Sequence, residues 1–457
     1  MLSFRSSPES WADLHFGQVR LGDRRLDRRV ARVACLLART PSGTLPTAMP
    51  VYADLKASYR LLSHPIATHD AITSPHRELV RQACAGPGEY LLIEDTTSLD
   101  FSFHQVNDLG QIGDGGGTGF HLHTTLAARY SDDGIELLGL FAQQAWVRKP
   151  DPDRAKQTSL QRSRRPRESE RWAKELPAAP VGVHWTYVAD RESDIYICMQ
   201  SLRERGLDLV IRAAHNRRLD SHEAHLLDAA ASAPLLGGYE LAMRGRPQSK
   251  ARKARIELRA CPVVIHPPHW LKEAQPLALN LVEARELNPP ATGGVRWLLL
   301  TSLPVENEQQ ARAVVARYSR RWLIEEYHKC LKTGCGMEES QLSTYHSLLA
   351  LLGLMAVVSI RLLEMKLLAE TRPDDEVPQE VLGKHGLRLL GALRPQKKPK
   401  GNWTWRSMLI SLGCLGGFIG RKSDGMPGWQ NLWRGQVRLQ NAIEGVEAIQ
   451  TLDQTCG

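Results

Sequence analysis

The sequence contains no run of about 18 uninterrupted apolar residues, the length at which a membrane-spanning helix becomes a candidate. Its longest apolar stretch, Leu348–Ile360, is followed by Arg361, Glu364 and Lys366, which favours a buried helix over a membrane span. The N-terminal residues also lack the apolar core of a secretion signal. We therefore expect a cytoplasmic protein with no membrane partner.

The cysteines form no Cys-x-x-Cys pair and no Cys/His pattern with metal-ligand spacing. A zinc site and a disulfide framework are therefore not indicated, and we expect reduced, mostly structural thiols. The glycine-rich stretch at residues 113–119, GDGGGTG, has no lysine and no P-loop spacing, so we assign no phosphate to it. The eight cysteines are Cys35, Cys84, Cys198, Cys261, Cys330, Cys335, Cys414 and Cys456.

The chain has 457 residues, which is long for one core and predicts two to four domains, or one core with a large insertion. Its composition, 42% hydrophobic and 24% charged, is ordinary for a globular protein. The net charge of +9 favours a polyanionic partner, although charge alone indicates only nonspecific association.

Basic residues gather first in the segment Arg20–Arg39. Leu26, Val30, Val33 and Leu37 recur there at helical spacing, which predicts an amphipathic helix with Arg24 and Arg28 on its polar side. A second helical run covers residues 52–65, so residues 1–70 form a predicted helical module. This module could contact DNA through Arg24 and Arg28, and a solvated arginine-rich helix is the alternative.

The next part of the chain predicts a mixed α/β arrangement. We expect a buried strand at Tyr90–Phe101 with Asp95 at its exit, and two strands at His121–Tyr130 and Leu137–Trp146. After a polar segment at residues 148–171 and a helix from Trp172, a strand should end at Asp190, followed by a helix near Asp194 and a strand at residues 207–213.

Residues 216–300 read as strands and turns and predict a β-rich insertion. Beyond it, we expect an apolar helix at residues 346–369, a Pro- and Lys-rich linker at 394–401 and a helical C-terminal segment. The first hairpin of the insertion is a basic patch that could contact DNA or be a solvated loop, and it contains Arg244, Arg246, Lys250, Arg252, Lys253, Arg255 and Arg259.

The segment Ala316–Gly334 predicts one helix with two different sides. Its polar stripe combines one carboxylate with three cations and a phenol, which suits a metal-binding acid placed beside phosphate oxygens. An ordinary solvated helix face is the alternative. The residues of the stripe are Tyr318, Arg321, Glu325, Lys329 and Lys332.

Three carboxylates, Asp95, Asp190 and Glu325, stand out because the first two are expected where strands end and the third lies on this helix. A single strand-end aspartate is commonly a turn former or helix cap. Together, the three fit two-metal phosphoryl transfer, in which oxygen ligands hold two Mg²⁺ ions roughly 3.5–4 Å apart.

Several motifs occur in the order and register of a known family. They are LLIEDTTSL around Asp95, ADRESDI around Asp190, RWLLLTS around Trp297, and the Y-x2-R-x3-E-x6-K pattern from Tyr318 to Lys332. RLGDRR near the N-terminus and LGGF-x-x-RKSDG-x-PGW at Leu415–Trp429 extend the match along the whole length. On these motifs the chain resembles the cut-and-paste DDE transposases of the insertion-sequence-four group.

This resemblance implies an α/β fold with an RNase H-like catalytic core, a β-rich insertion, and helical N-terminal and C-terminal domains. The N-terminal domain would read terminal inverted repeats, and the C-terminal region would form dimers. The expected divisions are an N-terminal DNA-binding domain at residues 1–70, the core at 71–215 and 301–370, the insertion at 216–300 and the dimerisation region at 371–457.

The same resemblance implies a transposase that requires two Mg²⁺ ions per site, with Mn²⁺ as a substitute, held by Asp95, Asp190 and Glu325. The reaction would proceed by a nick, a DNA hairpin, opening of the hairpin and strand transfer into target DNA. The enzyme would act as a homodimer on double-stranded DNA, in the bacterial cytoplasm near the nucleoid. The expected DNA contacts are Tyr318, Arg321, Lys329, Lys332, Trp297, Arg212, Arg24 and Arg28.

Two other functions stay open from the sequence. One is an RNase H-like nuclease that cuts DNA without strand transfer, and the insertion, Trp297 and the C-terminal region argue against it. The other is an inactive relative that occupies transposon ends as an inhibitor. The presence of all three acids argues against the second, because a chain freed from catalysis has no physical reason to retain them.

Overall fold

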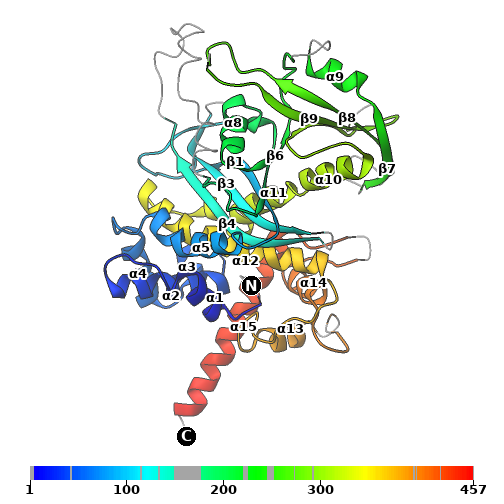
Figure 1. Cartoon of the computed structure of the whole chain (residues 1–457). Coiled ribbons are helices and arrows are strands. Elements are labelled where there is room, and N and C mark those ends of the chain that lie inside the picture. Colours follow the sequence, from blue (N-terminus) through cyan, green and yellow to red (C-terminus); the bar gives the residue numbers. More distant parts are fainter. Residues whose placement is uncertain are drawn as a thin grey trace.

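One mixed β-sheet of ten strands runs through the molecule, in the order β2-β3-β1-β5-β6-β10-β9-β8-β7, with β4 paired to β3 (Figure 1). The computed structural model describes residues 5–455 except 42–43, 114–115, 132–133, 149–175, 220–224, 244–251, 272, 291–292, 395–396, 398 and 422–423. The strands are β1(Glu89–Asp100), β2(Gly110–Ile112), β3(Gly117–Ser131), β4(Gly134–Trp146), β5(His184–Ala189), β6(Asp208–Arg212), β7(Leu235–Met243), β8(Arg252–Ile265), β9(Leu277–Glu286) and β10(Arg296–Thr301).

The central strands confirm the predicted α/β class. β1 pairs antiparallel with β3 and parallel with β5, and β5 pairs parallel with β6. The position of Asp95 at a strand exit was wrong, because β1 continues to Asp100 and Thr96 still pairs with His123 of β3. Asp190 does follow the last residue of β5 directly. The helix expected from Trp172 begins outside the described residues.

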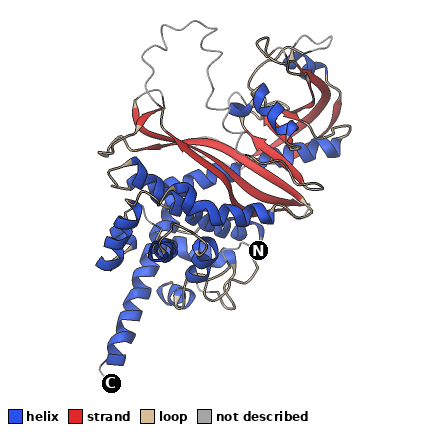
Figure 2. Ribbon diagram, turned by 60° about the vertical axis from the view of Figure 1, so that its left-hand side comes forward, coloured by secondary structure: helices blue, strands red, loops and turns tan. Residues whose placement is uncertain are grey.

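Helices cover both faces of these strands (Figure 2). Leu91 and Ile93 of β1 belong to the core cluster that contains the long helix α12(Tyr345–Thr371). Tyr90 and Leu92, which point the opposite way, belong to a second cluster with α8(Tyr196–Glu204). Successive side chains of a strand alternate between faces, so β1 carries apolar residues toward both helical layers.

The N-terminal helices form as the sequence predicts. In α2, Asp23 caps the N-terminus by accepting from the backbone N–H of Arg25, while Val30, Val33 and Leu37 are buried. The guanidinium of Arg361, from α12, lies 5.1 Å from the Trp11 ring of α1, so this helical module packs on the rest of the core. The helices of this part are α1(Pro8–Phe16), α2(Arg24–Arg39), α3(Leu45–Ala48), α4(Tyr52–Leu62) and α5(His69–Ala83).

The predicted β-rich insertion contains β7 to β10 and continues the central sheet, because β10 pairs antiparallel with β6. β10 therefore lies across the predicted division between residues 300 and 301. The insertion also contains a helix that the sequence analysis did not predict, α9(Leu226–Ser232). Arg244, Arg246 and Lys250 of the basic hairpin lie outside the described residues.

The C-terminal part is helical, as predicted. By length and composition α12 could cross a membrane, but 89% of its most apolar window is buried inside the protein, so it is a core helix. The last helix, α15(Trp429–Thr455), extends away from the body of the molecule (Figures 1 and 2). Between them lie α13(Gly386–Leu393) and α14(Trp405–Leu415).

Candidate active site

The two aspartates lie side by side because of the register between β1 and β5. Ile93 pairs with Val188 in this parallel ladder, and Asp95 and Asp190 each follow two residues later. Both side chains therefore leave the same face, on neighbouring strands about 4.8 Å apart. Asp95 accepts from the N–H of Thr96 at 2.9 Å.

Asp190 has a second role that the sequence analysis considered as an alternative. Its Oδ1 accepts from the backbone N–H of Glu192 at 2.8 Å, which caps the short 3-10 helix Arg191–Ser193. One carboxylate oxygen is thus used in the turn. The cap fixes the side chain at the edge of the strand beside Asp95.

The third acid, Glu325, lies on a segment that is less regular than predicted. The expected single helix is divided into α10(Glu308–Ser319), α11(Trp322–Lys329) and a π-helical turn at Cys330–Gly334. Arg321 lies at the junction as the N-cap residue of α11. From there its Nη1 lies 3.3 Å from Oδ2 of Asp95, and its Nη2 donates to Glu325 one turn later.

Negative charge exceeds positive charge in this cluster. Burial and the neighbouring Asp190 raise the pKa of Asp95 to about 7, even though Arg321 acts in the opposite direction. Burial disfavours the charge of Arg321, but the surrounding acids, Glu325 foremost, raise its pKa overall. One guanidinium therefore faces three carboxylates.

Tyr318 and Trp297 adjoin the cluster. Tyr318 is 4% exposed, so its predicted place on an open polar stripe was wrong. Its ring meets Trp297 edge to face, with centroids 5.0 Å apart. Burial raises the pKa of Tyr318, while the neighbouring positive charges of Arg321 and Arg212 act to lower it. Trp297, Tyr318, Arg212 and Arg321 thus form one continuous group beside the acids.

The two lysines of the predicted stripe point to different neighbours. Lys332 donates to the carbonyl of Ser98 in β1, three residues beyond Asp95. Lys329 is exposed and donates to Glu326 at 3.1 Å. A π turn takes more residues per turn than an α-helix, so the regular 100° spacing does not hold at Cys330–Gly334.

Glu326 is a residue that the sequence analysis missed. It accepts from Lys366 of α12 and, at 3.1 Å, from Nε1 of Trp429 at the start of α15. It therefore connects the helix of Glu325 to the C-terminal helices. The available signal was an acid beside Glu325 that fits neither the polar stripe nor the apolar side.

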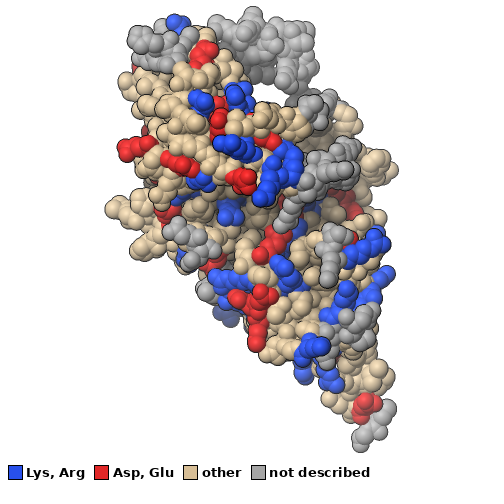
Figure 3. Space-filling view, turned by 90° about the vertical axis from the view of Figure 1, so that its right-hand side faces the viewer, with Lys and Arg blue, Asp and Glu red and all other residues tan. Residues whose placement is uncertain are grey.

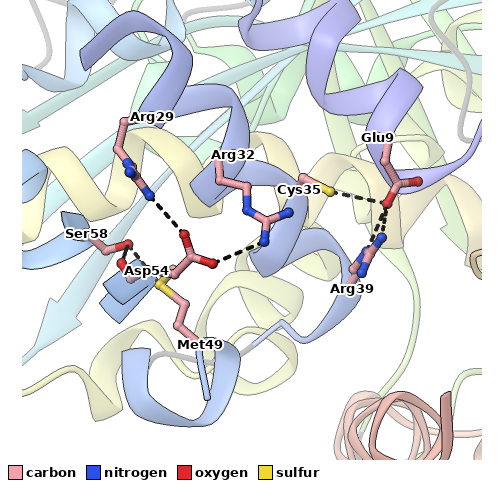
Figure 4. A network of polar contacts seen from close by, with 8 residues as sticks. All are labelled: Glu9, Arg29, Arg32, Cys35, Arg39, Met49, Asp54 and Ser58. Carbon is pink, nitrogen blue, oxygen red and sulfur yellow. Dashed lines mark hydrogen bonds and ion pairs between the residues drawn. The ribbon is translucent and has the colours of Figure 1, made fainter. Parts of the chain in front are cut away.

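The arginines of α2 divide into two groups. Arg29 and Arg32 both pair with Asp54, and Arg39 pairs with Glu9 (Figure 4). Within the described part of the chain, Arg24 and Arg28 have no such partner, and they line a groove of about 690 Å³ between α1 and α2. These two side chains remain open to a ligand.

The basic hairpin is less available than its composition suggests. Arg252 forms a two-bonded pair with Glu286, Lys253 lies 3.2 Å from Glu240, and Arg259 donates to the carbonyl of Ala233. Several Lys and Arg side chains lie next to Asp and Glu side chains on the molecular face drawn in Figure 3. Most of the hairpin cations that the structure describes therefore have partners within the protein.

The acids suit a divalent cation in chemistry. Carboxylate oxygens are the ligands that Mg²⁺ takes in proteins, and burial together with the nearby charge of Asp190 raises the pKa of Asp95. Among the described residues, no three Asp, Glu, His or Cys side chains are already arranged as a metal cage. Arg321 contacts both Asp95 and Glu325, so its guanidinium must turn aside before these acids can surround a metal.

A mixed sheet whose adjacent strands present two aspartates, with a glutamate-bearing helix next to them, is consistent with the core of a DDE nuclease. Two family models match this chain: transposase DNA-binding at residues 8–67 and transposase DDE domain at residues 168–360. The chain therefore is a DDE transposase with a transposase DNA-binding domain. The second match includes Asp190 and Glu325 and begins after Asp95. Domains of this kind generally use divalent metal ions.

Proposed function

We propose that this protein is a cut-and-paste DNA transposase of the insertion-sequence-four group, resembling the Tn-five transposase, with an RNase H-like core. It binds terminal inverted repeats, cleaves the ends through a hairpin intermediate and joins the 3′ ends to target DNA. The observation that carries this proposal is the meeting of Asp95, Asp190 and Glu325 around Arg321 in a chain that matches both transposase families.

Asp95, Asp190 and Glu325 are the proposed ligands of two Mg²⁺ ions. When bound, such ions activate the attacking water or 3′-hydroxyl and stabilise the leaving oxygen. Arg321 first neutralises Asp95 and Glu325, and on DNA binding it turns to a phosphate, which releases both carboxylates. Arg321 would therefore neutralise the acids in the absence of DNA, and the metal ions would neutralise them when DNA is bound.

The other members of the cluster hold DNA. Arg212 and Lys332 contact phosphates on either side of the acids, and Tyr318 lies beside Arg212 and Arg321. Trp297 receives a base that leaves the stack when the hairpin bends, and stacking of this kind contributes roughly 1–3 kcal/mol. Lys329 is the weakest candidate, because it is paired with Glu326.

The helices α1 to α4 read the inverted repeat, and Arg24 and Arg28 bind its phosphates. Their support is the open groove between α1 and α2. The active species is a homodimer bridged by two DNA ends in the cytoplasm. The free end of α15 supports this, because Ile449 and Leu452 are 59% and 62% exposed there and offer an apolar contact to a second copy.

The deciding experiment follows labelled transposon-end DNA with Mg²⁺ and a circular target plasmid. We expect nicked, hairpin and opened products, followed by end DNA joined to the plasmid. Cleavage without joining would instead indicate a nuclease, and binding without cleavage would indicate an inhibitor. The end sequence can be found by searching the DNA that flanks the gene for short inverted repeats.

A further inference from the structure

A buried carboxylate lies directly behind the two aspartates. Glu94 precedes Asp95 in β1 and points to the opposite face of the sheet, toward the core cluster of α8. It is 1% exposed, although Tyr90 and Leu92, which share its face, are apolar. A buried carboxylate is costly unless it is well hydrogen-bonded, so its contacts are informative.

Glu94 uses both of its oxygens to join three segments. Its Oε1 accepts from the hydroxyl of Ser193 at 2.8 Å, in the 3-10 helix that Asp190 caps. Its Oε2 lies 3.1 Å from Nε2 of His123 in β3. The other ring nitrogen of His123 lies 3.0 Å from the hydroxyl of Thr96.

These contacts have one consistent set of donors for a neutral imidazole. A carboxylate only accepts, so His123 donates from Nε2 to Glu94, and its Nδ1 accepts from the hydroxyl of Thr96. His123 is therefore hydrogen-bonded to the residues immediately before and after Asp95, which are Glu94 and Thr96. Ser193 extends the same chain of hydrogen bonds to the segment three residues after Asp190.

We propose that Glu94, His123 and Ser193 are positioning residues that set the separation of Asp95 and Asp190 for metal binding. This inference rests on the proposed function, in which those two aspartates are metal ligands. The ladder between β1 and β5 ends with the pair Ile93 and Val188, two residues before the aspartates. Beyond that pair, the hydrogen bond between Glu94 and Ser193 connects β1 to the turn after β5, on the face of the sheet opposite Asp95.

These hydrogen bonds do more than satisfy a buried carboxylate. They connect the two neighbours of Asp95, Glu94 and Thr96, to each other and to the turn that Asp190 caps. An apolar side chain at position 94 could pack with Leu92 and Cys198 without such links. Groups that support metal ligands without touching the metal typically change metal affinity by 10–100-fold when they are removed.

Mn²⁺ binding to the full chain in complex with transposon-end DNA tests the proposal, because DNA binding draws Arg321 away from the acids. The loss of the free Mn²⁺ signal in electron paramagnetic resonance measures it, and the DNA alone serves as the blank. We expect Ser193→Ala to bind Mn²⁺ about tenfold more weakly than the wild type. Ser193→Thr, which restores a hydroxyl, should bind within about twofold of wild type. The midpoint of thermal unfolding is recorded for each variant.

Tyr187→Phe is the matched control. It removes a buried hydroxyl that donates to Ser193 at 3.3 Å but leaves the link between Ser193 and Glu94. Its Mn²⁺ affinity should equal that of the wild type. If Ser193→Ala does not fold, Thr96→Val replaces it, because this change removes the hydroxyl that anchors His123 while keeping a β-branched strand residue.

The outcomes separate this inference from the proposed function. Equal Mn²⁺ binding by wild type and Ser193→Ala, or equal weakening in Tyr187→Phe, overturns the positioning role. If the positioning role is overturned in this way but Asp95→Ala still loses Mn²⁺ binding, the proposed metal site itself is retained. Wild-type Mn²⁺ binding by Asp95→Ala overturns the metal site and the positioning role with it.

Discussion

Arginine has different surroundings in the N-terminal helices and in the acid cluster. In α2, Arg29 and Arg32 share Asp54, while Arg24 and Arg28 face an open groove, so cations exceed acids. Around Arg321 the balance is reversed, with one cation among three carboxylates. The first surface suits the phosphates of DNA and the second suits a metal ion, so binding and cleavage should be separable by mutation.

The largest effect is expected in the acid cluster. Replacing Asp95, Asp190 or Glu325 with Ala should lower cleavage of end DNA by more than about 100-fold, beyond the usual effect of removing a group that only supports a ligand. Binding of end DNA should stay within about threefold, because cations elsewhere hold the phosphates. Gel assays of cleavage and of mobility shift measure the two quantities. If a variant cleaves with Mg²⁺ at the wild-type rate, the acid replaced in it is not a metal ligand.

The second effect belongs to α2. The double variant Arg24→Ala/Arg28→Ala should lose two phosphate contacts, which reduces the slope of log K against log salt by about 1.8 and the affinity at 0.15 M salt by about thirtyfold. Cleavage at saturating protein should be unchanged. Competition binding across a salt series gives both values.

Arg29→Ala/Arg39→Ala is the control for this variant, because it removes the same two charges from the same helix, at arginines already paired with Asp54 and Glu9. It should leave the salt slope unchanged. The same slope change in both variants would show that net charge, and not the open groove, governs binding. The structure also argues against deleting residues 1–70, because Trp11 and Val30 belong to the main core.

Trp297, beside the acid cluster, is expected to affect hairpin formation more than the first nick. Trp297→Ala should leave the first nick nearly intact and slow hairpin formation by about tenfold or more, as roughly 1.4 kcal/mol corresponds to a factor of ten. Time courses on labelled end DNA separate nicked, hairpin and opened products. Since Trp297 packs on Tyr318, the thermal midpoint must be measured as well. If nicking and hairpin formation slow by the same factor, Trp297 is a core residue and does not hold a base.

The last effect concerns the attachment of the N-terminal helices, and it is absent at neutral pH. His15 of α1 and His76 of α5 meet through their Nδ1 atoms at 2.9 Å, and His76 also accepts from the N–H of Leu140. Burial lowers the pKa of His15 to about 3 and that of His76 well below its usual value. The folded protein therefore binds fewer protons than the unfolded chain in mild acid.

It follows that stability is fully present above the unfolded pKa of about 6.5 and is lost as the pH falls below it. The expected loss is roughly 1.4 kcal/mol per pH unit for each histidine. Urea unfolding at pH 8, 6.5 and 5.5 measures it. His15→Gln/His76→Gln should show a shallower dependence, while His184→Gln, at an exposed position, should not.

Much of the fold could be predicted from the sequence, and the exceptions have physical reasons. Hydrophobic periodicity located α2, α4 and α12, and apolar runs located β1, β3 and β5. Periodicity could not predict that β1 continues past Asp95, because pairing with β3 supports the polar residues there. It also could not locate the junction at Arg321 or the π turn after Lys329, which have no signature in side-chain spacing.

The sequence by itself determined which residue types are present and their order: two aspartates at separate strands, a glutamate on a later helix, and arginines on an amphipathic N-terminal helix. Only the tertiary structure decided which charges are matched. Arg252 and Arg29 find acids far along the chain, Arg28 finds none among the described residues, and Arg321 finds several. Electrostatic pairing depends on distances across the fold, and composition and spacing do not contain these distances.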